Sequence, residues 1–383
     1  MNLDFHYYGT YLAAYLAGYK KEECEKIGYA AGFVDFCSAS LLESIQAPVL
    51  AATTQLPMEM VGQRIDILSL QKVTRIWASF HFLPAKLYEK EIRGSKEYRQ
   101  KYQLICDVNS VLLPACIELA KGKGTAAAGI AMHVLADSWA HRYFAGTPSL
   151  VINNTNFQFY EILEEDGKET ERPVTFKHNP AAKDHPEEGR YINSVFQIKE
   201  NHIMNLGHGR AGHLPDYSFA HYRYLPAWAN YEEKVKDNQT EFYFAFCQMI
   251  YALKYLRTGE GSFQTECYDF EAAKHLEKEI KLFFQKRQLD DSKDWISLIE
   301  KETGFAPEKF QTDRYQKEYL KAEKKEESFL GQFIEAALRQ KSMVTNKIFK
   351  AGNKKAGKSV DYNLSIVEKA ESIREFLTVK KKR

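Results

Sequence analysis

The stretch His133-Val-Leu-Ala-Asp137-Ser-Trp-Ala-His141 places a metal-competent side chain at every fourth position of a segment rich in helix-forming residues. Positions i, i+4 and i+8 of an α-helix share one face, with a drift of about 40° per step. Two imidazoles and a carboxylate therefore point into one space. Such nitrogen and oxygen ligands suit Zn²⁺ or a similar ion, whereas a hydrogen-bonded polar seam in a helical core is the plainer alternative.

The first residues supply a second pair of candidate ligands. Asp4 and His6 lie two positions apart, directly before the apolar segment 11–18. Asp4 also fits the N-cap of a helix, where a carboxylate accepts hydrogen bonds from free backbone amides. His6 has no comparable structural role, so we expect it to face the metal site.

Further candidates lie in two other parts of the chain. Asp35 ends an Ala/Gly-rich pattern, and His81 lies in the segment Ser79-Phe-His-Phe-Leu-Pro84. The segment 207–216 contains three glycines and a proline, which let the backbone bend around one centre; its polar side chains are His208, Arg210, His213 and Asp216. Residues 222–383, by contrast, contain only His275. One multinuclear site in the N-terminal part explains this uneven distribution.

The order of these residues resembles that of the zinc-dependent phospholipase C and S1/P1 nuclease superfamily. The resemblance covers roughly residues 1–225. It implies an all-α fold whose helices surround a trinuclear zinc site that hydrolyses phosphate esters. The chain also resembles an uncharacterised bacterial family whose members begin with a similar Asp-Phe-His-Tyr-Tyr segment and carry a Gly-rich His loop ending in Pro-Asp-Tyr. That second resemblance implies no activity.

The superfamily resemblance also implies an assignment of ligands to ions. The first ion takes Asp35, His81, His133 and Asp137, the second takes Asp4 and His6 with Asp137 as a bridge, and the third takes His141 with His213 and Asp216 or His208. The resembled enzymes use the amino group and carbonyl of a mature N-terminal tryptophan, whereas this chain begins Met-Asn-Leu, with Asp4 as a substitute oxygen donor. The spacings after Asp137 and within the last cluster also differ, so the expectation is two or three ions, zinc or another divalent transition metal.

Clustered dications stabilise the negative charge that grows on a phosphoryl group during attack and make water a better nucleophile at neutral pH. We therefore expect a hydrolase of phosphate esters, a phosphodiesterase of the nuclease or phospholipase C type. Asp137 is the expected bridging ligand in catalysis, and Arg142 and Arg210 are the candidates for gripping a non-bridging oxygen, because guanidinium binds phosphate through a planar fork. Each arginine fits a surface position equally well. Nucleic acid, nucleotide and phospholipid all remain open as substrates.

Composition limits these expectations. The formal net charge is +2, and a dedicated nonspecific nucleic-acid binder is usually more basic. Six widely spaced cysteines without a Cys-x-x-Cys pair predict reduced core thiols. No signal peptide and no membrane-spanning stretch is recognisable, so we expect the protein to stay in the cytoplasm.

Hydrophobic periodicity predicts a mostly α protein: a multi-helix metal-binding core with a small β-hairpin insertion and a helical C-terminal extension. The expected helices cover residues 5–18, 22–40, 57–78, 96–121, 125–144, 191–206 and 229–257. The hairpin covers about 155–178, with Asp166-Gly167 near its turn. The predicted domains are a hydrolase-like domain over 1–260 and a charged helical region over 261–383, whose helices 269–287 and 316–340 are candidate contacts for a second copy or another protein.

Two other functions remain open at this point. A histidine/aspartate-type nucleotide phosphohydrolase needs an adjacent His-Asp pair on a helix, and the chain has only Asp184-His185 in a predicted loop. A non-enzymatic interaction protein stabilised by zinc usually closes its sites with four cysteines, or with two cysteines and two histidines, and no such set is present. The metal-dependent phosphoesterase is the leading prediction.

Overall fold

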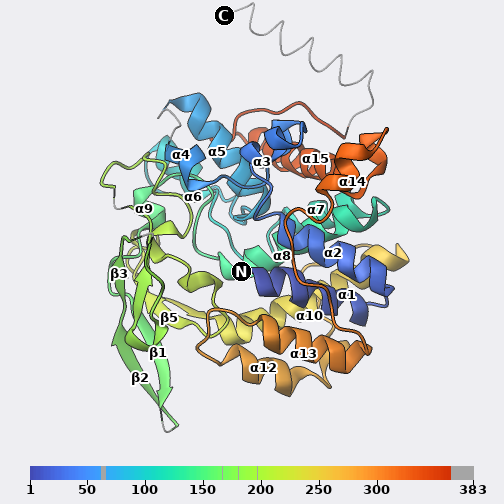
Figure 1. The fold of residues 1–383 in the computed structure, drawn as a ribbon. Helices are drawn as coiled ribbons and strands as arrows, with labels where there is room; N and C mark the ends of the chain where they lie inside the picture. The colour runs from blue at the N-terminus through green and yellow to red at the C-terminus, as the bar shows by residue number, and fades with distance from the viewer. Residues whose placement is uncertain (62–65, 166, 180, 196, 364–383) are drawn as a thin grey trace, which may run out of the picture.

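The computed structural model describes residues 1–363 except 62–65, 166, 180 and 196. The fold is mostly α-helical, as predicted, with a small sheet on one side (Figure 1). The helices are η1 (Phe5–Gly9), α1 (Thr10–Leu16), α2 (Lys21–Phe33), α3 (Ala39–Ser44), η2 (Val49–Ala51), α4 (Pro57–Val61), α5 (Ile67–Phe80), α6 (Lys96–Tyr102), α7 (Leu113–Ala120), α8 (Gly124–Ala140), α9 (Leu150–Asn153), η3 (Pro186–Glu188), η4 (Gly209–Ala211), η5 (Leu214–Asp216), η6 (Ala227–Ala229), α10 (Asn238–Thr258), α11 (Phe270–Ala273), α12 (Glu277–Phe284), α13 (Ser292–Thr303), α14 (Gln316–Lys321), η7 (Lys325–Glu327) and α15 (Phe329–Lys350).

Helix α8 forms the centre of the core. Every residue from Ala126 to Ala140 is buried, which is expected of a helix that is apolar on all sides. Helices α2, α7, α10 and α15 surround it. Gly129 allows α2 to approach closely, because a Cβ at this position would lie 2.4 Å from the carbonyl oxygen of Ile27. The helix that carries three of the candidate ligands is therefore fixed from all directions.

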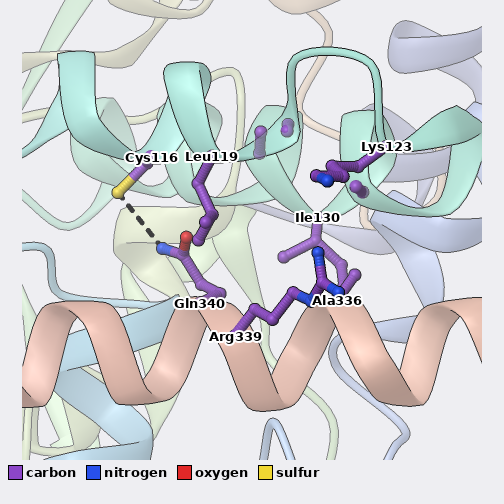
Figure 2. Close-up of a pocket in the computed structure, with 10 residues that line it drawn as sticks. Cys116, Leu119, Lys123, Ile130, Ala336, Arg339 and Gln340 are labelled. Carbon is purple, nitrogen blue, oxygen red and sulfur yellow. Dashed lines mark hydrogen bonds between the residues drawn. The ribbon is translucent and has the colours of Figure 1, made fainter. Parts of the chain in front are cut away.

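Helix α15 packs on the same core although it lies far along the chain. It runs beside α5, α7 and α8. Figure 2 shows Gln340 of α15 donating a hydrogen bond to the Sγ of Cys116 in α7, at 3.1 Å. The hollow beside this contact measures about 20 Å³, room for about one water molecule, so it is a packing gap rather than a ligand site. One continuous apolar core includes side chains from Met1 to Ala356 and so spans both predicted regions.

The predicted hairpin is present and belongs to a larger antiparallel sheet. Strands β1 (Tyr160–Glu165) and β2 (Lys168–Pro173) pair from Tyr160 with Pro173 to Glu165 with Lys168. The sheet has the order β2-β1-β5-β6, completed by β5 (His221–Tyr224) and β6 (Lys234–Asp237), and β3 (Thr175–Lys177) pairs in parallel with β4 (Arg190–Ile192). Gly167 adopts a positive φ of 72° in the turn, whereas Asp166 lies outside the described residues. In Figure 1 the β1–β2 ribbon projects from the helical body.

Two predicted helices differ from the structure around this sheet. The described residues of 191–206 form the end of β4 and then turns. The backbone N–H of Asn193 donates to the carbonyl oxygen of Lys177 and that of Ser194 donates to the carbonyl oxygen of Gly209, so neither amide is available to a helix. The helix predicted over 229–257 begins only at Asn238, because residues 234–237 pair with β5. Asp237 then caps α10 by accepting a hydrogen bond from the amide of Thr240.

The helix predicted over 96–121 is also interrupted. Between α6 and α7 the backbone of Cys106 pairs with residues 143 and 144 in an extended conformation, which removes the amides that a continuous helix would need. The predictions for 22–40, 57–78, 269–287 and 316–340 likewise merge shorter helices, separated by turns or by the undescribed residues 62–65. Element type was thus predicted better than element length.

The cysteines are free thiols, as expected; all are buried except Cys267, which is half-buried. Within the part of the chain that the structure describes, no helix is long and apolar enough to cross a membrane.

Candidate metal centre

The side chain of Asp137 lies at the centre of a cluster of imidazoles. Its Oδ2 lies 3.0 Å from Nε2 of His133 and 3.0 Å from Nδ1 of His81, and its Oδ1 lies 3.0 Å from Nε2 of His6. His133 and Asp137 share one face of α8, and His141 follows as the C-cap residue. The helical spacing therefore brings the three residues together as expected, and the two oxygens of Asp137 face different neighbours.

The N-terminal segment brings His6 into this cluster from η1. The ring of His6 stacks on that of His133, with 3.9 Å between centroids and 21° between planes. The amino nitrogen of Met1 also reaches the cluster, at 2.6 Å from Oδ1 of Asp137 and 3.3 Å from Oδ1 of Asp216. The beginning of the described chain thus adds one ring nitrogen and one amino nitrogen to the centre.

Asp35 and His81 complete one side of the cluster. Asp35 follows α2, and its Oδ1 lies 3.8 Å from Nδ1 of His81 and 3.9 Å from Nε2 of His133. His81 is the C-cap residue of α5. These three residues form one group whose ligand atoms lie within 4.8 Å of one another, and His6, His133 and Asp137 form another.

A third group comes from the end of α8 and the Gly-rich loop. Nε2 of His141 lies 2.9 Å from Oδ1 of Asp216, and Nε2 of His208 lies 3.6 Å from Oδ2 of the same carboxylate. Gly212 supports this arrangement with a φ of 59°, and its carbonyl oxygen accepts a hydrogen bond from Nδ1 of His208. A side chain at position 212 would collide with the carbonyl of Ile192, so the glycine lets the loop fold over the site.

Four of the five clustered histidines contact a backbone carbonyl through the ring nitrogen that is not their nearest atom to a carboxylate. These pairs are His81 Nε2 with Thr53 at 3.0 Å, His133 Nδ1 with Ala31 at 2.9 Å, His141 Nδ1 with His81 at 2.8 Å and His208 Nδ1 with Gly212 at 2.7 Å. A carbonyl only accepts, so this nitrogen carries the proton, and the other nitrogen of a neutral ring presents its lone pair to the cluster. Metal-binding histidines are commonly fixed in this way.

The protonation states of several of these residues fit ligand chemistry, whereas burial raises the pKa of Asp35 and, against the lowering effect of burial, Asp137 raises the pKa of His81. Burial lowers the pKa of His6, His133 and His208 to about 4 each, so these rings are neutral at pH 7. Burial alone would raise the pKa of Asp137, but its neighbours, first His141 and then the Met1 amino group, hold it well below the usual range. A metal ion requires neutral imidazole and ionised carboxylate ligands. The donor set therefore fits Zn²⁺ or a similar divalent ion.

The three groups open into one cavity of about 880 Å³. Asp35, His81, Asp137, His141, His208 and Asp216 line this cavity, together with Met1. Its volume lies in the range of small-molecule sites in proteins. A closed structural zinc site would have no such opening, so this arrangement allows an outside molecule to reach the cluster.

Asp4 does not join the cluster. Its Oδ2 accepts a hydrogen bond from the backbone N–H of Asp291 at 2.8 Å, and it makes no side-chain cap to its own helix. Burial raises the pKa of Asp4 to about 6. The structure therefore gives no support to Asp4 as an oxygen donor to a second ion.

Arg142 lies in a different ionic network behind the end of α8. Its Nε lies 3.2 Å from Oδ1 of Asp107 and its Nη1 lies 3.0 Å from Oε1 of Glu241. Glu241 also pairs with the buried Lys236, whose Nζ donates to the carbonyl of Trp139 at 2.6 Å. Arg142 thus helps to anchor the end of α8 and is not among the described residues that line the cavity.

The Gly-rich loop presents its residues differently from expectation. Arg210 is only 2% exposed, whereas its neighbours Gly209 and Gly212 line the cavity. The side chain of His213 is 71% exposed, with Nδ1 3.6 Å from Oδ2 of Asp216. Of the two histidines left open as ligands, His208 belongs to the third group and His213 lies at the cavity rim.

The amino group of Met1 is the cluster member that reasoning from the residues did not assign. The signal that could have indicated it is the N-terminal amine ligand of the superfamily named in the sequence analysis. Asn2 helps to place it, because its backbone N–H donates to the carbonyl of Asp216 at 3.2 Å.

A family model matches residues 1–348, which include all the clustered residues and nearly all of α15. The chain belongs to DUF6765, a family of unknown function. No curated protein and no solved structure matches the chain.

Proposed function

We propose that this protein is a metal-dependent hydrolase of phosphate esters, acting as a phosphodiesterase with two or three zinc ions or similar divalent cations. The observation that carries the proposal is the convergence of five histidines and three aspartates in adjoining groups, of which three histidines and all three aspartates line an 880 Å³ cavity. Divalent cations bound there would supply positive charge for the phosphoryl oxygens and a water acidic enough to attack near neutral pH.

The protein's own residues prepare the centre before any substrate arrives. Backbone carbonyls hold four imidazoles in one tautomer, and α8 fixes the carboxylate of Asp137 between three rings. Fixed ligands need little reorganisation during the reaction, which is the main source of electrostatic catalysis. Asp137 would contact two ions through its two oxygens, and Asp216 would contact a third together with His141 and His208.

The positive charge for a phosphate would come from this centre rather than from an arginine. Lys183, which is exposed, is the single lysine or arginine among the described residues that line the cavity. Arg142 is paired elsewhere, and Arg210 is buried beside the loop. This distribution makes phosphate binding depend on metal, which is a property that can be measured.

The experiment combines element analysis with turnover. The full chain is purified without chelators, its metal content is measured, and hydrolysis of bis(p-nitrophenyl) phosphate is followed before and after removal of metal with a chelator and return of Zn²⁺. We expect two or three metal equivalents per chain and hydrolysis that disappears and returns with the metal. His141→Ala should lose both metal and hydrolysis, whereas the matched control His275→Ala, at a histidine paired with Glu302 on the surface, should keep both. Metal content near zero, or turnover unaffected by chelation, would contradict the proposal.

A further inference from the structure

The cavity beside the metal centre has one apolar wall. Met60, Trp77, Ile203, Met204 and Leu206 line it, and these side chains pack together with Val73 as one hydrophobic cluster, which Trp77 joins to the main core. Residues 203–206 belong to the segment between β4 and η4, and the other lining residues belong to α4 and α5. Several distant segments thus contribute apolar side chains to one surface of the cavity.

Trp77 connects this wall to the metal centre. Its ring centroid lies 4.8 Å from that of His81, one helical turn further along. The indole Nε1 donates to Oε1 of Gln55 at 3.2 Å, so its polar atom already has a partner. Trp77 is half-buried and lines the cavity. Part of its apolar ring is therefore accessible from the cavity, next to His81.

The charges around the cavity do not suit a polyanion. A protein that tracks a nucleic-acid backbone carries a groove of lysines and arginines along the strand. Lys183 is the single such residue among the described lining residues, and other lining side chains, such as Asn193 and Ser194, are polar and neutral. One phosphate at the metal centre is compatible with this charge distribution, whereas a row of phosphates is not.

Exposed apolar side chains also lie at the rim of the cavity. Leu56 is 43% exposed and Met58 is 81% exposed, and they flank Pro57, which lines the cavity. On another segment Leu289, 38% exposed, also lines it. Large apolar side chains gathered at the mouth of a cavity indicate a site for an apolar ligand or surface, in contrast to single ones scattered elsewhere.

We propose that the substrate is an amphiphilic phosphate ester with a linear alkyl or acyl chain. Its phosphate lies at the histidine/aspartate centre, and its chain runs along Met60, Trp77 and Met204 towards the rim at Leu56 and Met58. Methionine side chains are flexible and polarizable, so they adapt to a chain better than to one rigid shape. This inference rests on the proposed function for the phosphate end of the substrate and on the apolar wall for its alkyl or acyl chain.

The test measures binding of methyl, butyl and octyl phosphate to the zinc-loaded full chain by titration calorimetry, each below the concentration at which it forms micelles. We expect the dissociation constant to fall by up to about fourfold for each methylene that becomes fully buried. The double variant Met60→Ser/Met204→Ser should keep methyl phosphate binding and flatten the chain-length dependence. Val235→Ser, at a 42% exposed position on β6, is the matched control and should bind all three like the wild type.

The outcomes separate the two proposals. Zinc-dependent binding of methyl phosphate tests the metal centre, so its absence would overturn the proposed function. Equal binding of methyl and octyl phosphate, or an unchanged chain-length dependence in the folded double variant, would overturn the apolar chain site alone. Tighter binding of adenosine monophosphate than of octyl phosphate would indicate that the apolar wall binds a planar base. That result would overturn the inference as well.

Discussion

Nδ1 of His81 lies 3.0 Å from Oδ2 of Asp137, and Nε2 of the same ring lies 3.0 Å from the carbonyl oxygen of Thr53. The end of α5 and the last turn of α8 thus meet through one imidazole that is fixed on both sides. His133 lies 3.0 Å from the same carboxylate oxygen. Asp137 is therefore the side chain through which the groups of the centre are connected.

Replacing Asp137 tests this connection. Asp137→Asn keeps the size of the side chain and removes the negative charge that the proposed cations would require. We expect hydrolysis of bis(p-nitrophenyl) phosphate to fall by at least about 10²-fold, together with a loss of bound metal. The control Asp294→Asn removes a carboxylate that pairs with Lys286 near the surface and should have little effect on turnover. Wild-type turnover at full metal occupancy in Asp137→Asn would remove Asp137 from the mechanism.

Removal of metal should destabilise the fold. A ligand that binds only the folded state stabilises it by about 2.7 kcal/mol when its concentration is 100 times its dissociation constant. We expect a chelator to lower the melting temperature of the wild type and to leave that of metal-free Asp137→Asn unchanged. Differential scanning calorimetry with and without chelator measures both. Equal melting temperatures of the metal-loaded and chelated wild type would contradict metal binding to the folded state.

The clustering of the candidate ligands on α8 could be predicted from the sequence because it depends on local geometry alone. Helical spacing alone puts His133 and Asp137 on the same face of α8, whatever that face packs against. Arg142 follows the end of α8 at Ala140, so helical spacing no longer fixes its direction, and its partners Asp107 and Glu241 come from distant segments. No local pattern could have identified that ionic network.

The Gly-rich loop shows the same limit. Its composition predicted a bend that gathers side chains, and His208 and Asp216 do meet. Which of its polar residues turns inward depends on the φ of 59° at Gly212 and on the carbonyl of Ile192 that packs against it. The wrong prediction of a helix over 191–206 has the same cause. The backbone of this segment pairs with β3 and with Gly209, and hydrophobic periodicity carries no information about such long-range contacts.

The two loop histidines should differ in their effect on metal content. The side chain of His208 is only 15% exposed and lies 3.6 Å from Asp216, whereas the side chain of His213 is 71% exposed at the rim. We expect His208→Ala to lose about one metal equivalent and His213→Ala to keep the wild-type content, as measured by element analysis of each purified variant. Loss of metal in His213→Ala with retention in His208→Ala would reverse this assignment.

Arg142 should affect stability rather than chemistry. Arg142→Met removes a partner from both Asp107 and Glu241 in a partly buried network, which costs about 1–3 kcal/mol in the free energy of unfolding. The variant that remains folded should hydrolyse the substrate at the wild-type rate, because the side chain lies outside the cavity. Urea unfolding and steady-state kinetics measure the two effects. A large fall in kcat with unchanged stability would place Arg142 at the phosphate after all.

Lys341 of α15 holds the segment that carries the Thr53 carbonyl, and its burial makes stability depend on pH. Its Nζ donates to the carbonyl oxygens of Leu50 at 2.6 Å and Ala52 at 2.5 Å. Burial, aided by the charges of Arg75 and Lys72, lowers the pKa of Lys341 from 10.5 to about 7. The nearby Cys37 thiol is neutral up to pH 10.5, because burial raises its pKa to about 12.

The sign of the pH dependence follows from these values. Between about pH 7 and pH 10.5 the unfolded chain binds the lysine proton and the folded chain releases it, so the free energy of unfolding rises with pH. The cost of burying the charge is fully present below pH 7 and disappears above pH 10.5. Lys341→Met should remove this contribution, which is at most about 1.4 kcal/mol per pH unit. Urea unfolding of metal-free wild type and variant at pH 6, 8 and 9.5 measures it, with Lys301→Met, at an exposed lysine on α13, as the control. Parallel pH profiles for the wild type and Lys341→Met would show that Lys341 keeps its proton in the fold.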